Sequence, residues 1–348
     1  MLLDNSFSNQ SKLKIIGGAK RCLLLKKTNK FTITQKYMRV IFFGTPEFAV
    51  PTLEKLLAEP DFEVVGVVSQ PDTRRGRGNQ VSPPPVKAAA ITKNPELKIW
   101  QSDRLKKDQA VLTELNNLAA DVFVVVAYGQ ILSKKILKMP KYGCINVHGS
   151  LLPKYRGAAP IQWAIANGES KTGITTMQMD AGIDTGAMLL KSELEILPED
   201  NTDTLSVKLA NLGADLLIDT LRRLESITPE PQDDALSCYS PMIGREDWEL
   251  DWNLEAIALH NRIRAFYPNC YTEFRGQRLK ITKTEVIDAS INLENLGKVT
   301  EIRKGKGFVV QTSQGLLLIK EVQPAGKKLQ SGWDFVNGAR IAIGESLA

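Results

Sequence analysis

The chain has 348 residues, of which 43% are hydrophobic and 24% charged, and its mean hydropathy is −0.16. These values exclude a disordered chain, a collagen and a disulfide scaffold, and no apolar run approaches the roughly 20 residues of a membrane-spanning helix. A single core stops growing at about 250–300 residues, so we expect two domains.

The net charge of +6 is unevenly distributed along the chain. Residues 1–37 carry eight basic side chains and one acidic side chain, residues 38–255 sum to −7, and residues 256–348 carry fourteen basic and eight acidic side chains. We call 38–255 the acidic front region and 256–348 the basic rear region. Such a charge difference indicates that the rear region binds a polyanion.

Cysteine and histidine usage argues against a metal and against an oxidising compartment. The four cysteines lie far apart and only two histidines occur, so the clustered ligands of a structural zinc site are missing. Without a secretory segment, the sequence predicts a cytoplasmic protein that has no metal and does not enter a membrane.

The segment 1–37 shows no clean periodicity, and three interpretations stay open for it: an unused upstream start, a disordered basic arm or an organelle transit peptide. Met38 opens the first apolar strand and is itself a possible start residue. We expect the native chain to begin at Met38, or deletion of 1–37 to leave stability and activity unchanged.

From Met38 onward, short β-rich segments alternate with helical stretches, and the strands are apolar enough to be buried on both faces. Residues 38–227 are therefore predicted to form a Rossmann-like α/β domain, with a mostly parallel sheet covered by helices. The expected strands are 38–43, 62–69, 97–100, 121–127 and 143–148, and leucine spacing predicts one helix over 203–225.

A proline- and acid-rich stretch, Thr228-Pro-Glu-Pro-Gln-Asp-Asp, indicates a linker, which we assign to 228–242. Behind it, residues 243–348 are predicted to form a smaller, OB-like β-barrel that starts with one helix near 253–266. Its expected strands are 270–274, 277–285, 297–302, 307–312 and 315–322.

The loop after the first strand does not suit a nucleotide cofactor. It reads Phe43-Gly44-Thr45-Pro46-Glu47, whereas a pyrophosphate cradle needs G-x-G-x-x-G, and no P-loop occurs in the chain. The sequence therefore argues against an NAD enzyme and against an ATP-driven one.

The densest chemistry lies in Cys144-Ile-Asn146-Val-His148, at the end of an expected strand. The period of two places Asn146 and His148 on one face, roughly 6.6 Å apart, where an amide and an imidazole can converge on one small group. Two alternatives stay open, a structural polar pair and a Cys144 thiolate nucleophile, although a strand-end cysteine is usually buried packing.

A carboxylate that could join this pair follows in Met179-Asp180-Ala-Gly182-Ile-Asp184-Thr-Gly186. A carboxylate beside His148 would fix its tautomer and could accept a proton from an attacking amine. Asp180 and Asp184 both qualify on chemistry alone, and the simpler explanation for each is an Asx turn.

Asn146-x-His148, Ser150-Leu-Leu-Pro153 and Asp184-Thr-Gly together resemble the folate-dependent formyltransferases over about residues 38–348. The longer motifs from Phe43, His148 and Met177 are similar to those of members that formylate methionyl-tRNA. The resemblance implies catalysis by Asn146, His148 and Asp184, and tetrahydrofolate contacts from Ser150, Leu151, Leu152 and Pro153. It also implies 10-formyltetrahydrofolate as the formyl donor.

A second basic feature, Arg74-Arg75-Gly-Arg77-Gly, lies within the acidic front region. Charged loops are usually only solvated, but arginines between glycines also suit phosphate contacts. The resemblance implies a basic insertion here that enters the acceptor stem, with Arg77 at the matching arginine. Together with Lys304 and Lys306 of the barrel, it implies that tRNA is contacted from two sides.

We therefore expect a monomeric enzyme that formylates initiator methionyl-tRNA, with Asn146 and His148 stabilising the tetrahedral oxyanion. One alternative is a related enzyme for a small amine, a glycinamide ribonucleotide or an amino sugar nucleotide, which would need neither basic feature. The other is a non-catalytic RNA-binding protein, which would have no use for the triad. His260 is interpreted as packing or capping.

Overall fold

The computed structural model describes residues 37–75, 80–288 and 296–347. The expectations about the basic N-terminal segment and about Arg77 therefore lie outside the described residues.

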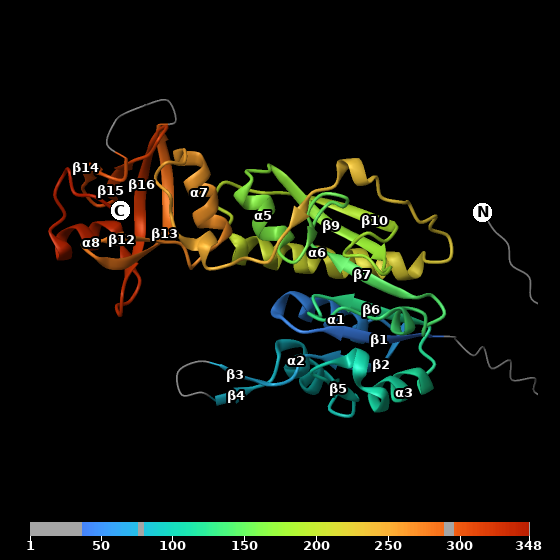
Figure 1. Ribbon diagram of the computed structural model, residues 1–348. Helices are drawn as coiled ribbons and strands as arrows, with labels where there is room; N and C mark the ends of the chain where they lie inside the picture. Colours follow the sequence, from blue (N-terminus) through green and yellow to red (C-terminus); the bar gives the residue numbers. More distant parts are fainter. Residues whose placement is uncertain (1–36, 76–79, 289–295, 348) are drawn as a thin grey trace, which may run out of the picture. The chain divides into compact units, whose positions relative to one another are not determined.

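Seven strands form the sheet of the first domain, in the order β10-β9-β7-β6-β1-β2-β5 (Figure 1). The five strands from β7 to β5 run parallel, and β9 and β10 run antiparallel at one edge. The bounds are β1 Met38–Gly44, β2 Phe62–Ser69, β5 Ile99–Gln101, β6 Val122–Val126, β7 Cys144–His148, β9 Lys171–Gln178 and β10 Met188–Glu195. The predicted mostly parallel sheet is confirmed.

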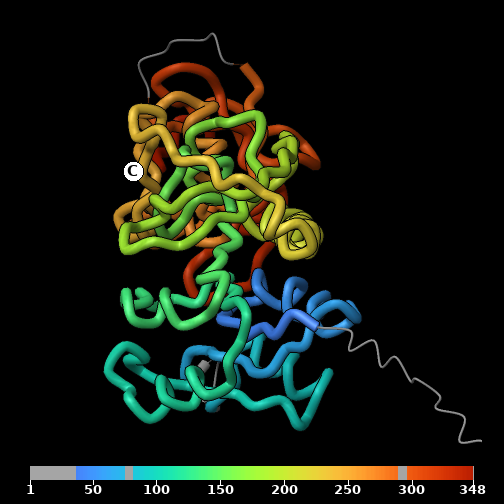
Figure 2. The backbone as a smooth tube through the Cα atoms, turned by 90° about the vertical axis from the view of Figure 1, so that its right-hand side faces the viewer, coloured from blue at the N-terminus to red at the C-terminus, as the bar shows by residue number. Residues whose placement is uncertain are grey.

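Helices cover both faces of this sheet, as the apolar strands require. In β1, Val40 and Phe42 are buried in the cluster that contains α1, α2, α5 and α6, whereas Ile41 and Phe43 are buried in the cluster that contains α3 and α4. The helices are α1 Val50–Ala58, α2 Pro85–Lys93, α3 Gln109–Asn117, α4 Lys134–Leu137, α5 Pro160–Ala166 and α6 Thr202–Arg222. Figure 2 shows α6 nearly end-on in yellow, beside the blue α1.

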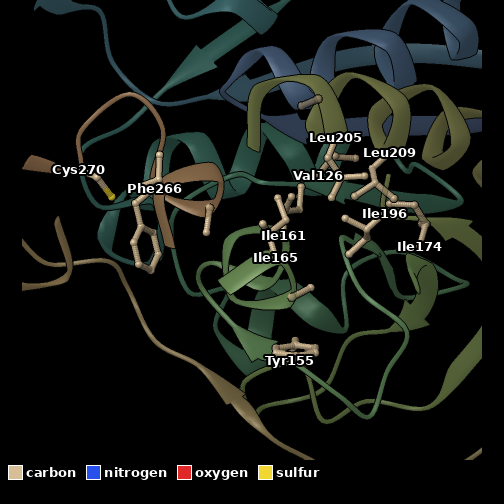
Figure 3. Close-up of a cluster of buried hydrophobic side chains, with 14 of the residues drawn as sticks. Val126, Tyr155, Ile161, Ile165, Ile174, Ile196, Leu205, Leu209, Phe266 and Cys270 are labelled. Carbon is tan, nitrogen blue, oxygen red and sulfur yellow. The ribbon is translucent and has the colours of Figure 1, made fainter. Parts of the chain in front are cut away.

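The helix α6 matches the predicted amphipathic helix closely. It begins with a capping box, in which the Asn201 side chain accepts a hydrogen bond from the Thr204 amide at 3.0 Å. Leu205 and Leu209 point toward Ile161 and Ile165 of α5 (Figure 3). Burial of each such side chain contributes about 1.5–3 kcal/mol, so this contact anchors the segment that follows β7.

The second domain is a five-stranded antiparallel sheet in the order β12-β13-β16-β15-β14, with β17 paired to β16. Residues 344–347 pair with both of its edges, through Leu347 with Phe274 and Ser346 with Lys298, which confirms the predicted barrel. The elements are α7 Ala256–Ala265, β12 Tyr271–Phe274, β13 Gln277–Asp288, β14 Val299–Arg303, β15 Gly307–Gln311, β16 Leu316–Pro324, β17 Gln330–Ser331 and α8 Gly332–Ala339.

The segment expected to be a linker is ordered against the first domain. Its backbone pairs with β10 where Met188 and Glu230 exchange two hydrogen bonds of 2.8 Å. Further on, β11 (Tyr239–Ser240) pairs in parallel with the two-residue strand β8 (Arg156–Gly157). We call residues 228–240 the strap, because they run back along the first domain and their backbone pairs with it.

Candidate active site

The polar side chains predicted from the sequence meet at the carboxyl end of β7. Asn146 and His148 both project from the end of this buried strand, and they pair across to Met177 and Thr175 of β9. The chain leaving β9 then returns with Asp184. Asn146 Nδ2 donates to Asp184 Oδ1 at 3.4 Å, and His148 Nδ1 lies 3.6 Å from Asp184 Oδ2.

The ring of His148 is only 5% exposed and is held from both sides. Its Nε2 lies 2.9 Å from the Tyr155 carbonyl oxygen. Because a carbonyl can only accept, Nε2 carries the hydrogen, and Nδ1 faces the carboxylate of Asp184. The ring therefore presents Nδ1 to the space in which Asn146 and Asp184 also meet.

Asp184 lies on the loop between β9 and β10 in the left-handed region, with φ of +53°. Its Oδ2 accepts a hydrogen bond from the Gly157 amide at 2.9 Å, and the side chain is 17% exposed. Asp180, the other candidate, makes its hydrogen bonds elsewhere. Its Oδ1 accepts from the Gly182 amide at 3.0 Å and the Thr185 hydroxyl at 2.8 Å, which is the Asx turn considered above.

Gly157 supplies the amide that fixes the Asp184 carboxylate, and its backbone conformation requires glycine. Its φ is +121°, and a Cβ at this position would lie 2.6 Å from the Ser240 carbonyl oxygen and 2.7 Å from the Tyr239 ring. The absence of a side chain therefore lets β11 approach β8.

The two other reactive side chains considered above lie in packed surroundings. Cys144 is fully buried, and burial raises the pKa of its thiol to about 12, so it is not a thiolate nucleophile at neutral pH. Burial lowers the pKa of His260 to about 4, with Arg264 adding to the effect. His260 Nδ1 lies 2.9 Å from the Thr284 hydroxyl, so this histidine belongs to the packing of α7 on β13.

The loop assigned to tetrahydrofolate is fixed against β9. The Thr175 hydroxyl donates to the Ser150 carbonyl at 2.8 Å and accepts from the Leu152 amide at 3.0 Å. Ser150 and Leu152 are buried, and the Ser150 hydroxyl donates to the Lys154 carbonyl at 2.7 Å. Leu151 and Pro153 are half-buried, so these two and the backbone are the parts of the loop within reach of a ligand.

Four of the five predicted tRNA contacts lie in the part of the chain that the structure describes, on two hairpins. Arg74 is exposed on β3 (Thr73–Arg75), which pairs with β4 (Gln80–Ser82), and Arg75 ends the same strand. The sequence analysis placed these two arginines in a charged loop, whereas the structure places them on a short strand. Lys304 and Lys306 are exposed at the turn between β14 and β15.

Sequence reasoning missed three contributors to the site: the Gly157 amide, the Tyr155 carbonyl and Gln232 of the strap. Two of them act through the backbone, which leaves no trace in residue type. Gln232 Nε2 donates to the carbonyls of Asp184 and Gly186, both at 2.7 Å. Nothing in the local sequence marks a glutamine in a proline-rich stretch as part of a site 48 residues upstream.

Two kinds of feature are missing from residues 37–75, 80–288 and 296–347. No helix in them is long and apolar enough to cross a membrane. No group of three or more His, Cys, Asp or Glu side chains in the same ranges could hold a metal ion.

Two family models match the chain, a formyl transferase domain over 38–221 and a formyl transferase C-terminal domain over 242–340. Methionyl-tRNA formyltransferase of Trichormus variabilis is 55% identical over 332 residues, covering 89% of this chain and 99% of the relative. The protein of the same name from Thermosynechococcus vestitus is 53% identical over 327 residues, covering 89% and 98%. Among solved structures, the sugar 3N-formyl transferase WlaRD shares the fold, with a TM-score of 0.60, 21% identity and coverage of 84% and 100%.

Proposed function

Since the chain belongs to the formyl transferase family, we propose that it transfers a formyl group from 10-formyltetrahydrofolate to the α-amine of methionine on initiator methionyl-tRNA. The relatives named for this reaction match it over nearly their whole length, through both domains. The observation that carries the proposal is the convergence of Asn146, His148 and Asp184 at the end of β7.

The reaction needs a base, a stabiliser of negative charge and no covalent enzyme intermediate. The amine nitrogen attacks the formyl carbon, a new C–N bond forms, and the formyl oxygen becomes an oxyanion. The proton lost by the amine passes to Asp184, and the bond to nitrogen N10 of the donor then breaks as that nitrogen receives a proton. The products are formyl-methionyl-tRNA and tetrahydrofolate.

Asn146 and His148 suit the oxyanion because both direct donors at one point. The Asn146 amide and a hydrogen on His148 Nδ1 would point at an oxygen placed between them, and neither side chain can swing away, since both are buried on β7. Donors fixed in advance stabilise a developing charge far more than donors that must first reorient. The Tyr155 carbonyl accepts the hydrogen of Nε2, so His148 donates from Nδ1 in the protonated form of the ring, which carries a hydrogen on both nitrogens.

For the donor substrate we propose the carboxyl edge of the parallel strands, next to the loop 150–153. The loop after β6 leaves the sheet beside Asn146, because Val125 pairs with Asn146, and it carries the exposed Ile131. Ile131 and Gln130 line a cavity of about 380 Å³ together with Asp103, Arg104, Lys106 and Lys107. The apolar side chain of Ile131 beside the basic Arg104, Lys106 and Lys107 suits a folate, which joins an aromatic ring to an anionic glutamate end.

For the tRNA we propose contacts from Arg74 and Arg75 of β3, from Arg77, which lies outside the described residues, and from Lys304 and Lys306 on the barrel. Unlike a small amine, a tRNA is long enough to meet charges on both domains. We also propose that the protein acts as a monomer. We propose the cytoplasm as its place of action, where charged initiator tRNA is present.

The test is to incubate the protein with 10-formyltetrahydrofolate labelled on the formyl group and with charged initiator tRNA. The proposal predicts label on the aminoacyl end of the tRNA. Glycinamide ribonucleotide and an amino sugar nucleotide serve as competing acceptors in parallel reactions. Label on either of these in preference to the tRNA would contradict the proposal and support the small-amine alternative.

A further inference from the structure

The strap contains a glutamine that belongs to neither of the two matched domains. The matches end at residue 221 and resume at residue 242, so Gln232 lies in the stretch between them. Its side chain nevertheless reaches the loop that carries Asp184. The Gln232 amide nitrogen donates to two carbonyl oxygens of that loop, those of Asp184 and Gly186, each at 2.7 Å.

The orientation of the Gln232 amide is set from its other end. Arg156 is 9% exposed, and its Nε donates to Gln232 Oε1 at 2.8 Å, while its Nη2 lies 2.8 Å from the Asp234 carboxylate. A guanidinium can only donate and a carbonyl can only accept, so the amide oxygen must face Arg156 and the amide nitrogen must face the loop. The two-sided arrangement leaves one orientation of this side chain.

The Asp184 loop needs support from outside, because the hydrogen bonds that Asp180 makes lie within the loop itself. Residues 181–183 are exposed, and Asp180 binds Gly182 and Thr185 within the same loop. The carboxylate of Asp184 is fixed by the Gly157 amide, and Gly157 lies in β8, which pairs with β11 of the strap. Both the backbone and the carboxylate of Asp184 are therefore linked to the strap, one directly and one through β8.

We propose that Gln232, oriented by Arg156, is a positioning residue for formyl transfer, which holds the Asp184 backbone so that its carboxylate meets Asn146 and His148. The proposal rests on the proposed function and adds a residue to the same site. Gln232 acts only through Asp184. A shift of about 1 Å in a reacting group can cost up to about 100-fold in rate, so loss of the two donated hydrogen bonds is expected to be visible in turnover.

The experiment compares Gln232→Ala and Gln232→Glu in the full-length protein. The glutamate variant keeps the size of the side chain and the acceptor for Arg156, but it replaces the donating amide by an oxygen that faces two carbonyls. We expect kcat for methionyl-tRNA formylation to fall about 10-fold to 100-fold in both variants, with KM for each substrate changed less than about 3-fold. Glu230→Ala is the matched control, because Glu230 contributes only its backbone to the strap, and it should keep the parent kcat.

The double variants decide whether Gln232 acts through Asp184. In an Asp184→Ala background, Gln232→Glu should cause no further loss, because residues that act as a unit are not additive. A thermal unfolding midpoint of Gln232→Glu within a few degrees of the parent excludes a general loss of fold. If the alanine variant does not fold, the near-isosteric glutamate variant still gives the answer.

Three results would overturn the inference: a parent-like kcat in Gln232→Glu, a loss confined to KM, or losses that multiply in the double variant. A failure of the proposed function would look different, because the parent itself would then not formylate methionyl-tRNA. An active parent with an equally active Gln232→Glu rejects the positioning role alone.

Discussion

The triad is built from two regions that differ in how they are held. Asn146 and His148 stand on a strand that is buried on both faces and paired on both sides, so the sheet itself fixes them. Asp184 stands on an edge loop at a positive φ, and its place depends on single contacts from Gly157 and Gln232. Rigid elements position side chains by packing, whereas a loop needs hydrogen bonds from elsewhere in the chain.

The largest expected effect comes from the strand-borne pair. Asn146→Ala and His148→Ala should each lower kcat by about 100-fold or more, because each removes a donor that we propose for the oxyanion. KM for either substrate should change little, since these donors act in the transition state. Steady-state kinetics with varied tRNA and varied donor measure both quantities, and near-parent turnover would remove that residue from the mechanism.

A change in the support of the loop should be smaller but should affect both stability and rate. Gly157→Ala places a Cβ 2.6 Å from the Ser240 carbonyl, so β8 and β11 must separate. We expect a loss of about 1–3 kcal/mol in the free energy of unfolding and a lower kcat. Urea denaturation and initial rates measure the two effects.

Gly276→Ala is the control for that experiment. Gly276 also has a positive φ, +72°, but a Cβ there meets nothing within 4 Å. Gly276→Ala should therefore lower the free energy of unfolding only through the strain of a positive φ, and it should keep the parent kcat. Equal effects of the two substitutions on kcat would show that the contact between β8 and β11 does not support Asp184.

The two basic hairpins should respond differently from the triad and from each other. Arg74→Ala and Arg77→Ala should raise KM for tRNA and leave the use of the formyl donor unchanged. The double change Lys304→Ala and Lys306→Ala should weaken tRNA binding uniformly and flatten its salt dependence, by about one counterion for each lost phosphate contact. Measuring the Kd for tRNA at salt concentrations from about 50 to about 300 mM separates the effects of the arginine variants from those of the lysine variant. Unchanged tRNA use in all of these variants would contradict the two-sided contact.

The smallest effect concerns His260, which should matter for stability and not for rate. Its pKa is lowered from 6.5 to about 4 by burial and by Arg264, against the opposite influence of Glu285. The neutral form is favoured in the folded protein, so its contribution is complete above pH 6.5 and is lost as the pH falls toward 4. His260→Gln should remove at most about 3 kcal/mol of that pH dependence.

The free energy of unfolding of the parent and of His260→Gln, measured by urea denaturation at several pH values, checks this expectation. Carboxylates titrate in both proteins, so the difference between the two curves isolates the histidine. Parallel curves between pH 4 and 6.5 would show that His260 is not held neutral by the fold. Turnover near neutral pH should be equal in the two proteins.

The sequence predicted what depends on local periodicity and left open what depends on distant contacts. The period of two in 143–148 placed Asn146 and His148 on one face, because a buried strand leaves no other arrangement. Asp180 and Asp184 could not be told apart from the sequence, since the choice depends on which carboxylate the turn itself uses.

The strap was predicted to be a linker from its prolines and acidic residues. Its contacts with the first domain, the backbone pairing of Glu230 and the hydrogen bonds of Gln232, leave no pattern in the local sequence. The edge strand β10 was not predicted either, because half-buried and exposed positions alternate along most of its length.

The central claim, that loop-borne Asp184 works together with the strand-borne pair, is tested most directly by a single-turnover measurement on Asp184→Asn. The variant keeps the shape of the side chain and can still meet the Gly157 amide through its oxygen, but it cannot accept the proton of the amine. With enzyme in excess over charged initiator tRNA and with saturating donor, we predict a formylation rate about 100-fold or more below the parent, at an unchanged Kd for tRNA. A rate within about 3-fold of the parent would contradict the account.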